Sequence, residues 1–238
     1  MAIKIQKLHY ALRNKTNHSA SEYLKKLTVA QVDYYLNEAI DTVLEAYYPK
    51  AEVNQEIREQ LRPLEIKNRE LPFTENSDHV IAKYPSDYYR RLRQYVIATN
   101  KCCEAQERNL IVRIVQSDDL SEILKSPNWQ PSWDFEETVA DESHEGLHIY
   151  KGDFDIKKVF IDYYRKPLRV AAPSLEKGGT YIDESGDTIS QNQDFEIDST
   201  FLWRAVVDVA ALLVVRDYSR VENFQTQLQT ILFKTRYE

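Results

Sequence analysis

The chain contains little cysteine, glycine or proline. Among its 238 residues, 2 are cysteine, 5 are glycine and 8 are proline. So little glycine and proline argues against a disordered or fibrous chain. Cys102 and Cys103 are adjacent, a spacing that rarely forms a disulfide, and the sequence has no C-x-x-C pair for a zinc ribbon or redox motif. We therefore expect a globular protein that is made in a reducing cytosol.

Signals for a membrane or for nucleic acid are also weak. The most apolar run, Ala205–Val215, is interrupted by Asp208 and is too short to span a bilayer, and the first residues lack the form of a signal peptide. The net charge is −7, whereas phosphate binding usually needs an excess of Lys and Arg. We interpret the run Arg90, Arg91 and Arg93 as a solvated strand face, with phosphate binding as the alternative.

The first part of the chain has helical periodicity. Residues 1–18 are predicted to form an extended arm, and Ser19 with Glu22 has the spacing of a capping box for a short helix. A stronger capping box at Thr28 and Gln31 predicts a helix over residues 28–48, which Pro49 should end. A second helix should follow and close at Pro63. The apolar positions behind these two helices are Val32, Tyr35, Leu36, Ala39, Ile40, Val43, Leu44, Tyr47, Val53, Ile57 and Leu61.

The middle of the chain changes to the periodicity of strands. Short apolar or alternating segments predict strands at 92–98, 110–115 and 156–164 and a short helix at 120–124. Two segments, 126–146 and 173–198, are expected to be long loops. In the second, Tyr181-Ile182 and Thr188-Ile189 flank the turn pair Ser185-Gly186, which is typical of a hairpin.

The C-terminal part is predicted to be helical again. Asp198 or Ser199 should cap a buried helix over 201–215, in which Arg204 and Asp208 are spaced to pair. Ser219 and Glu222 form a further capping-box pattern before a last helix with Phe224, Leu228, Ile231 and Leu232 on one face. The fold class is therefore α+β, with N- and C-terminal helices packed together and a β-rich middle segment. The expected divisions are residues 1–75, 76–197 and 198–238.

One catalytic motif matches literally, because residues 144–148 read H-E-G-L-H. In a zinc protease, H-E-x-x-H places two imidazoles on one face of a helix beside a glutamate. Gly146 weakens a helix, and residues 147–150 resemble the start of a strand. We therefore predict a loop-to-strand junction with surface histidines, and no catalytic, metal-binding or cofactor-binding residue. A metal-dependent hydrolase that uses His144, Glu145 and His148 is the alternative.

Tyrosine is abundant, with 16 residues and four doublets. Tyrosine is favoured at protein interfaces because it combines a large apolar ring with a polar tip. Equally, one member of each doublet could pack in the core while its neighbour lies half-exposed. The two interpretations stay open at this point.

A set of ordered segments resembles one family along most of the chain. The segments are His9-Tyr10, Asn17, residues 36–39, residues 115–120, residues 147–156, Val159, residues 161–167, residues 205–210 and residues 218–228. In this set the chain resembles the structural proteins of crAss-like bacteriophages that form rings in the head–tail connector and tail. The resemblance also implies a strand pair around a turn near Lys151-Gly152, although Lys151 departs from the acid or small polar residue that is usual there.

What the resemblance implies is a virion protein without catalysis. The expected role is an adaptor or tail ring subunit, assembled in the bacterial cytoplasm, that closes with copies of itself into a ring, expected to be twelvefold to match a portal. Its other partners would be the portal and neighbouring tail ring proteins, with genomic DNA only passing through the channel and no membrane contact. Helices 28–48 and 199–234 would form the ring body, and the middle segment with its loops would contact neighbouring rings. A scaffolding or interaction protein absent from the mature particle is a further alternative.

Overall fold

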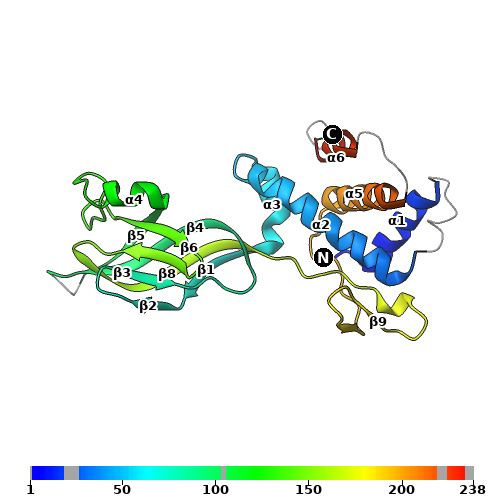
Figure 1. Cartoon of the computed structure of the whole chain (residues 1–238), viewed down its shortest axis with the longest axis horizontal. Coiled ribbons are helices and arrows are strands. Elements are labelled where there is room, and N and C mark those ends of the chain that lie inside the picture. Colours follow the sequence, from blue (N-terminus) through cyan, green and yellow to red (C-terminus); the bar gives the residue numbers. More distant parts are fainter. Residues whose placement is uncertain (1, 19–26, 103–105, 219–223, 234–238) are drawn as a thin grey trace. The chain divides into compact units, whose positions relative to one another are not determined.

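The computed structural model describes residues 2–18, 27–102, 106–218 and 224–233 (Figure 1). The chain divides into two compact units. A helical unit combines residues 1–64 with residues 167–238, and a sheet unit comprises residues 65–166. The predicted α+β class, with N- and C-terminal helices around a β-rich middle, is confirmed.

Five α-helices of the described residues build the helical unit. They are α1 (Ile5–His18), α2 (Val29–Ala51), α3 (Gln55–Leu61), α5 (Thr200–Tyr218) and α6 (Phe224–Phe233), with short 3-10 helices at Arg62–Leu64 and Pro173–Leu175. The capping box is present, since the Thr28 side chain accepts from the Gln31 amide and the Gln31 side chain accepts from the Thr28 amide. Pro49 does not end α2, because it lies in the last turn and removes only one helical hydrogen bond there.

Helix α5 forms the centre of this unit and packs against α1 and α2. Ser199 caps it, since its side chain accepts from the Leu202 amide. Asp208 forms an ion pair with Lys15 of α1, whereas the sequence had suggested Arg204 as its partner. Residues 1–18 were predicted to be extended, and this was wrong: α1 buries Ile5, Leu8 and Leu12 at helical spacing. The capping boxes expected at 19–22 and 219–222 lie outside the described residues.

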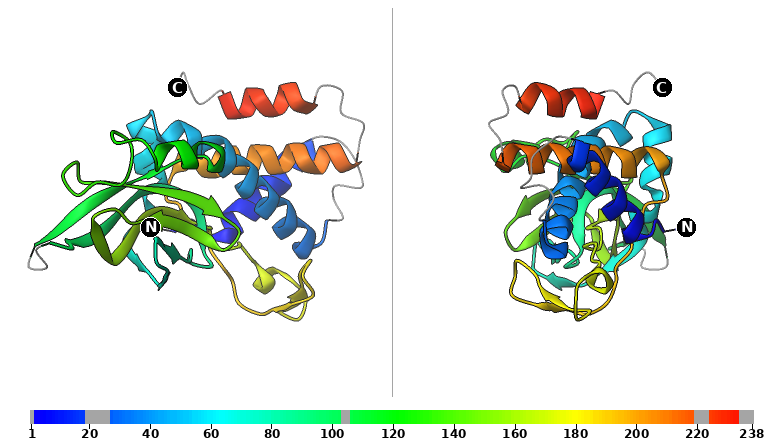
Figure 2. Two further views of the ribbon diagram at one scale, coloured as in Figure 1. Left: turned by 60° about the vertical axis from the view of Figure 1, so that its left-hand side comes forward. Right: turned by 90° about the vertical axis from the view of Figure 1, so that its right-hand side faces the viewer.

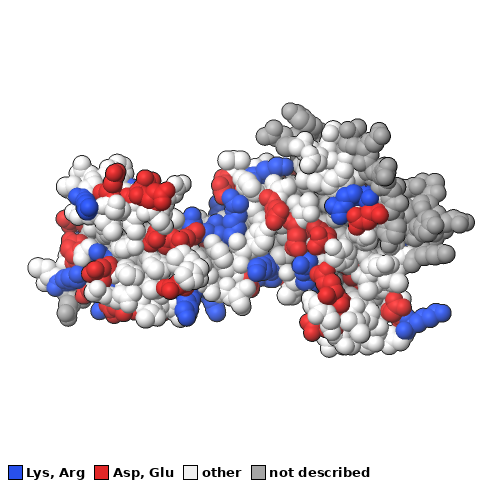
Figure 3. Space-filling model, in the orientation of Figure 1, with Lys and Arg blue, Asp and Glu red and all other residues white. Residues whose placement is uncertain are grey.

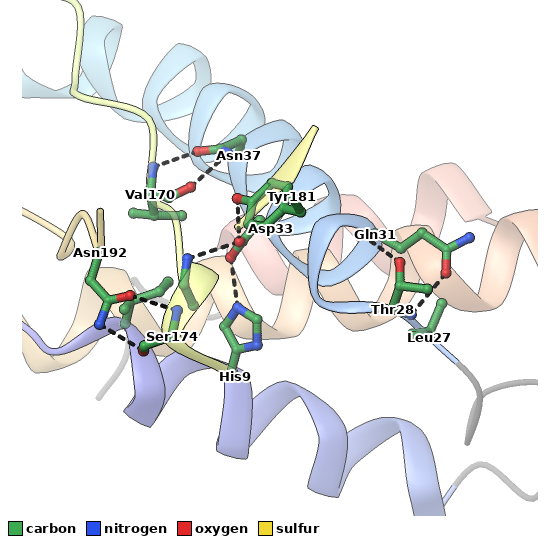
Figure 4. A network of polar contacts seen from close by, with 12 residues as sticks. His9, Leu27, Thr28, Gln31, Asp33, Asn37, Val170, Ser174, Tyr181 and Asn192 are labelled. Carbon is green, nitrogen blue, oxygen red and sulfur yellow. Dashed lines mark hydrogen bonds and ion pairs between the residues drawn. The ribbon is translucent and has the colours of Figure 1, made fainter. Parts of the chain in front are cut away.

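A long segment after residue 166 is tied to these helices by buried polar contacts (Figure 4). Asp33 of α2 accepts hydrogen bonds from the Ala172 amide (2.9 Å) and the Tyr181 hydroxyl (2.6 Å) and lies 2.6 Å from Nε2 of His9. Asn37 exchanges two hydrogen bonds with the backbone of Val170. The predicted hairpin is confirmed as strands β9 (Tyr181–Ile182) and β10 (Thr188–Ile189). Because residues 167–197 pack this way, they belong to the helical unit and not to the β-rich middle.

The sheet unit is one eight-stranded sheet that curls round a single core. Its strands are β1 (Glu65–Leu71), β2 (Phe73–Glu75), β3 (His79–Ala82), β4 (Tyr88–Asn100), β5 (Glu107–Ile114), β6 (Glu137–Ser143), β7 (Gly146–Tyr150) and β8 (Phe154–Arg165), with the short helix α4 (Ser117–Ile123) after β5. The order is β1-β8-β4-β5-β6-β7-β3-β2, and β5 with β6 is the parallel pair. Only Pro72 separates β1 from β2, so one kinked segment joins the two ends of the order and closes the sheet like a barrel.

The core of this barrel follows the alternation of the strands. Inward residues are almost fully buried, and they include Val96 and Ala98 of β4, Leu110 of β5, and Val159 and Ile161 of β8. The strands at 92–98, 110–115 and 156–164 are thereby confirmed, each a few residues longer or shorter than predicted. The segment 126–146, predicted to be a loop, contains β6 because residues 138–140 are buried in parallel pairing with β5.

Two further expectations need correction. The structure divides the chain at 64/65 and 166/167, whereas the sequence placed the divisions at 75/76 and 197/198. The difference arises because β1 and β2 already belong to the sheet. In addition, β7 and β8 flank the turn at Lys151-Gly152 but do not pair with each other, since β7 lies between β6 and β3 and β8 lies between β1 and β4.

Candidate assembly interface

The H-E-x-x-H residues lie on a tight hairpin and not on a helix. Ser143 of β6 pairs with Gly146 of β7, so His144 and Glu145 form the two-residue turn between them. The His144 side chain is 90% exposed. His148 points elsewhere: its Nε2 lies 2.9 Å from the Ser143 hydroxyl, and its ring stacks on His79 of β3 with centroids 5.3 Å apart. The predicted strand start is confirmed, and the helical geometry of a zinc protease is not formed.

This hairpin borders a shallow depression of about 670 Å³. Its lining mixes apolar and polar residues from β2, β3, the segment after β3 and the β6–β7 hairpin: Thr74, Ile81, Lys83, Tyr84, Ser143, His144, Glu145 and Gly146. Within the described part of the chain, no group of three His, Cys, Asp or Glu side chains is placed to hold a metal ion. The depression therefore presents a mixed apolar and polar surface, and the described residues bring no convergent set of metal ligands to it.

The arginine run of β4 is engaged with its own unit. Arg91 forms an ion pair with Glu142 of β6, and the same carboxylate accepts a hydrogen bond from the Tyr84 hydroxyl at 2.8 Å. Burial, followed by this hydrogen bond, raises the pKa of Tyr84. Arg93 lies over the ring of Tyr95, 5.4 Å from its centroid. These contacts agree with the solvated-face interpretation for Arg91 and Arg93.

A row of apolar side chains crosses the solvent side of the barrel. Strand pairing places Phe160 of β8 opposite Tyr95 of β4, and Tyr95 opposite Ile111 of β5. The rings of Tyr95 and Phe160 stack with centroids 5.1 Å apart, and the Tyr95 hydroxyl donates to Asn68 of β1 at 2.9 Å. Ile111 is 54% exposed. Two consecutive strands, β4 and β5, and the distant strand β8 therefore present one continuous apolar surface.

The loop between α4 and β6 extends this surface with two more aromatic side chains. Trp129 is 57% exposed and Phe135 is 71% exposed. Arg113, two residues after Ile111 on the same face of β5, lies over the Trp129 ring at 4.9 Å and donates to the Trp129 carbonyl at 2.8 Å. The Ile111 amide donates to the carbonyl of residue 136, which brings the end of the loop beside the apolar row.

The loop is held in place by buried contacts. Trp133 packs in the barrel core, and its amide donates to Asp153 at 3.1 Å. Gly152 lies so close to the loop that a side chain there would overlap the Pro131 carbonyl. The exposed Trp129 and Phe135 are therefore displayed by a rigid support, which lowers the entropy lost on binding. We call this surface, formed by Tyr95, Ile111, Trp129, Phe135 and Phe160, the outer face.

Two ion pairs border the outer face, and two arginines lie on it. Lys158 lies 3.9 Å from Glu70, and Arg108 lies 3.6 Å from Glu136. Figure 3 shows that acids and bases are interspersed over the sheet unit in the view drawn, with uncharged areas between them. Arg93 over Tyr95 and Arg113 over Trp129 place two cations beside the aromatic side chains of the outer face, a combination that is enriched at protein–protein contacts.

The tyrosine doublets do not form this surface. Both members of Tyr47-Tyr48 and of Tyr163-Tyr164 are buried, while Tyr34 is exposed beside a buried Tyr35. The core interpretation, with one member buried and its neighbour half-exposed, therefore fits Tyr34-Tyr35, whereas two doublets are buried at both positions. The outer face was missed because its members are isolated in the sequence. The usable signal was strand alternation: Val96 and Val159 point into the core, so their neighbours Tyr95 and Phe160 point to solvent.

Comparisons with known proteins add no relative. A scan against protein-family models and a search of curated proteins both found no match to the chain. The resemblance to ring proteins of crAss-like phages thus stays a prediction. Among the described helices, none is sufficiently long and apolar to cross a membrane.

Proposed function

We propose that this chain is a virion structural protein, a ring-forming subunit of a phage head–tail connector or tail. It acts without catalysis and forms part of the conduit for DNA. Its partners are copies of itself in a closed ring, twelvefold to match a portal, together with the portal and the neighbouring tail rings. It assembles in the bacterial cytoplasm and remains in the virion.

The outer face is the observation that carries this proposal. Exposed apolar surface rimmed by polar residues is typical of protein–protein contacts, and Trp, Tyr, Phe and Arg are enriched there. Ile111, Trp129 and Phe135 are each more than half exposed. Covering them would contribute about 1–2 kcal/mol each, which is small beside the cost of association. A single contact should therefore be weak, and a closed ring, in which every subunit makes two, should be favoured.

The organisation of the chain supports the same role. The helical unit and the sheet unit each have their own core, so each can contact a different neighbour. The net charge of −7 suits the wall of a DNA channel, because a negative lining repels phosphate and allows DNA to slide. The resemblance to ring proteins of crAss-like phages points to the same class.

Native mass spectrometry and cryo-electron microscopy of the purified full chain, over rising protein concentration, test the proposal. We expect closed rings to appear cooperatively, and we expect the chain in the proteome of purified virions at the copy number of one ring. A chain that stays monomeric at high concentration and is missing from virions would overturn the proposal. Stoichiometric zinc with hydrolytic activity would support the metal-dependent hydrolase instead.

A further inference from the structure

We propose that the β9–β10 hairpin of one copy docks on the outer face of a neighbouring copy, so that the ring closes head to tail. This inference rests on the proposed ring-forming function and names the partner of the outer face. It follows from three features of the described residues: two arginines on the outer face without an acidic partner, a hairpin with acids that have no basic partner, and an exposed isoleucine beside those acids.

The outer face presents two arginines that form no ion pair with the described carboxylates. Arg93 lies over the Tyr95 ring, 5.4 Å from its centroid. Arg113 lies over the Trp129 ring at 4.9 Å and donates to the Trp129 carbonyl. The acids at the rim of this face pair with other cations. An occupant that covers the aromatic rings must therefore bring its own negative charge, because a guanidinium that is desolvated without a partner costs free energy.

The β9–β10 hairpin carries the complementary charge. Residues 181–189 include Asp183, Glu184 and Asp187 and contain no Lys or Arg. The Asp183 carboxylate accepts hydrogen bonds from the Ser185 and Asp187 amides, so it holds the turn together. Glu184 and Asp187 are exposed, and neither takes part in an ion pair within the part of the chain that the structure describes. Their carboxylates are therefore available to the arginines of another copy.

The hairpin also presents an apolar side chain on its free side. Strand pairing places Ile182 opposite Thr188. Neighbours on a strand point to opposite sides, so Tyr181, whose hydroxyl donates to Asp33 of α2, faces the helices and Ile182 faces away from them. Ile182 is 66% exposed. Figure 2 shows this segment in yellow, on the opposite side of the helical unit from α6 in red. One apolar contact and two acids are thus displayed together on an anchored support.

This combination selects the hairpin among the exposed apolar positions described in the helical unit. Ile182 has acids and no Lys or Arg within three positions. The other exposed apolar side chains either have a basic residue within three positions or, at Tyr34, adjoin the buried Asp33. Those with a basic neighbour are Tyr10, Val53, Leu168 and Leu175.

The symmetry of a ring agrees with this pairing. A ring closes through heterologous contacts, in which one surface of each subunit meets a different surface of the next. Each copy carries one hairpin and one outer face, which is the required pair. Packing of two outer faces against each other would instead bring the arginines of both copies together and would end at a dimer.

An exchange of charges in the full-length protein tests the contact. The hairpin variant Glu184→Lys/Asp187→Lys makes the hairpin basic, and the face variant Arg93→Glu/Arg113→Glu makes the outer face acidic. Sedimentation velocity measures assembly, and circular dichroism with tryptophan fluorescence confirms that each variant is folded. If the loss of Arg113 disturbs the Trp129 loop, Arg93→Glu alone serves as the face variant.

We expect either variant alone to assemble about tenfold or more weakly than the wild type, because like charges then meet. A mixture of the two should assemble again, since an acidic hairpin meets a basic face in one contact and a basic hairpin meets an acidic face in the next. Native mass spectrometry should find the two variants in equal number. The control Glu38→Lys/Glu45→Lys makes the same change of charge at exposed acids of α2 and should assemble as the wild type does.

Assembly of the hairpin variant alone at wild-type strength would overturn the inference and indicate that a different partner covers the outer face. Assembly of the face variant alone at wild-type strength would overturn it equally. A mixture of folded variants that does not recover would exclude direct pairing of the two surfaces. If the wild type itself forms no rings, the proposed function fails together with the inference, whereas a wild-type ring that tolerates both variants refutes the inference alone.

Discussion

Replacement of Asp33 by alanine should destabilise the helical unit strongly. The Asp33 carboxylate is almost fully buried and lies within 2.6–2.9 Å of Nε2 of His9, the Ala172 amide and the Tyr181 hydroxyl. Alanine leaves the His9 imidazole and the Ala172 amide buried without an acceptor, at about 1–3 kcal/mol each, and leaves the part-buried Tyr181 hydroxyl without its acceptor at a smaller cost. Because the surrounding structure relaxes in part, we expect a total loss of about 4 kcal/mol, in the range measured when one partner of a buried pair is removed.

The isosteric change Asp33→Asn separates the charge from the shape. An asparagine can still accept through its oxygen, but its NH₂ group would face one of the three donors. If it faces Nε2 of His9, the imidazole proton must move to Nδ1, which is buried without a hydrogen-bond partner among the described residues. We expect a loss of about 2 kcal/mol for this variant, between the wild type and alanine.

Urea denaturation followed by helical circular dichroism measures both losses, and hydrogen exchange should show residues 170–181 opening first. A double-mutant cycle with His9→Ala isolates the His9–Asp33 coupling. A change of less than about 1 kcal/mol in the free energy of unfolding of Asp33→Ala would refute this prediction, because three donors that lose their acceptor should cost more.

Three further changes test the sheet unit. Gly146→Ala should lower the free energy of unfolding, measured with heat or urea, by about 2–4 kcal/mol, because Gly146 has φ +136° and a Cβ would overlap the Ala82 carbonyl. Gly178→Ala, with open space around the added Cβ, should lower it less. Lys151 lowers the pKa of Glu75. The contact therefore stabilises the fold above the ordinary glutamate pKa, and this stabilisation is lost as the pH falls through the lowered value. An NMR titration should show a higher Glu75 pKa in Lys151→Met. Burial, with the hydrogen bond to Asp87, raises the pKa of Tyr163 to about 12. The Tyr163–Asp87 contact therefore stabilises the fold below the ordinary tyrosine pKa, and this stabilisation is lost as the pH rises toward 12. Ultraviolet titration of the wild type and of Tyr163→Phe measures this pKa.

The sequence predicted the elements that have local signals. The capping box at Thr28 and the apolar spacing after it located α2, and alternation located β8. Helix α1 was missed because it has no acidic first turn and its apolar positions, Ile5, Leu8 and Leu12, are sparse. Strand β6 was hidden because acids surround its short apolar centre, and its burial depends on parallel pairing with β5 across α4 and the 126–136 loop.

The candidate interface could be predicted only in part, for a related reason. Alternation along one strand states which side chains point outward, so Tyr95 and Phe160 were each accessible to sequence reasoning as outward-facing residues. It does not state which strands are neighbours. The row exists because β8 pairs with β4 and β4 pairs with β5, which brings Phe160 beside Tyr95 across 65 positions of sequence (160 − 95). An outward aromatic residue alone needs no explanation, whereas several in one row on a rigid support do.

The outer face and the H-E-x-x-H motif differ in whether the fold brings their side chains together. That motif is a literal match in sequence, but its chemistry requires two imidazoles to converge, and the hairpin turns His144 into solvent while His148 stacks on His79. The outer face has no motif, but strand pairing and the anchored loop bring its members together. For this chain, convergence of side chains in space is therefore the better guide to function, and it favours assembly over metal chemistry.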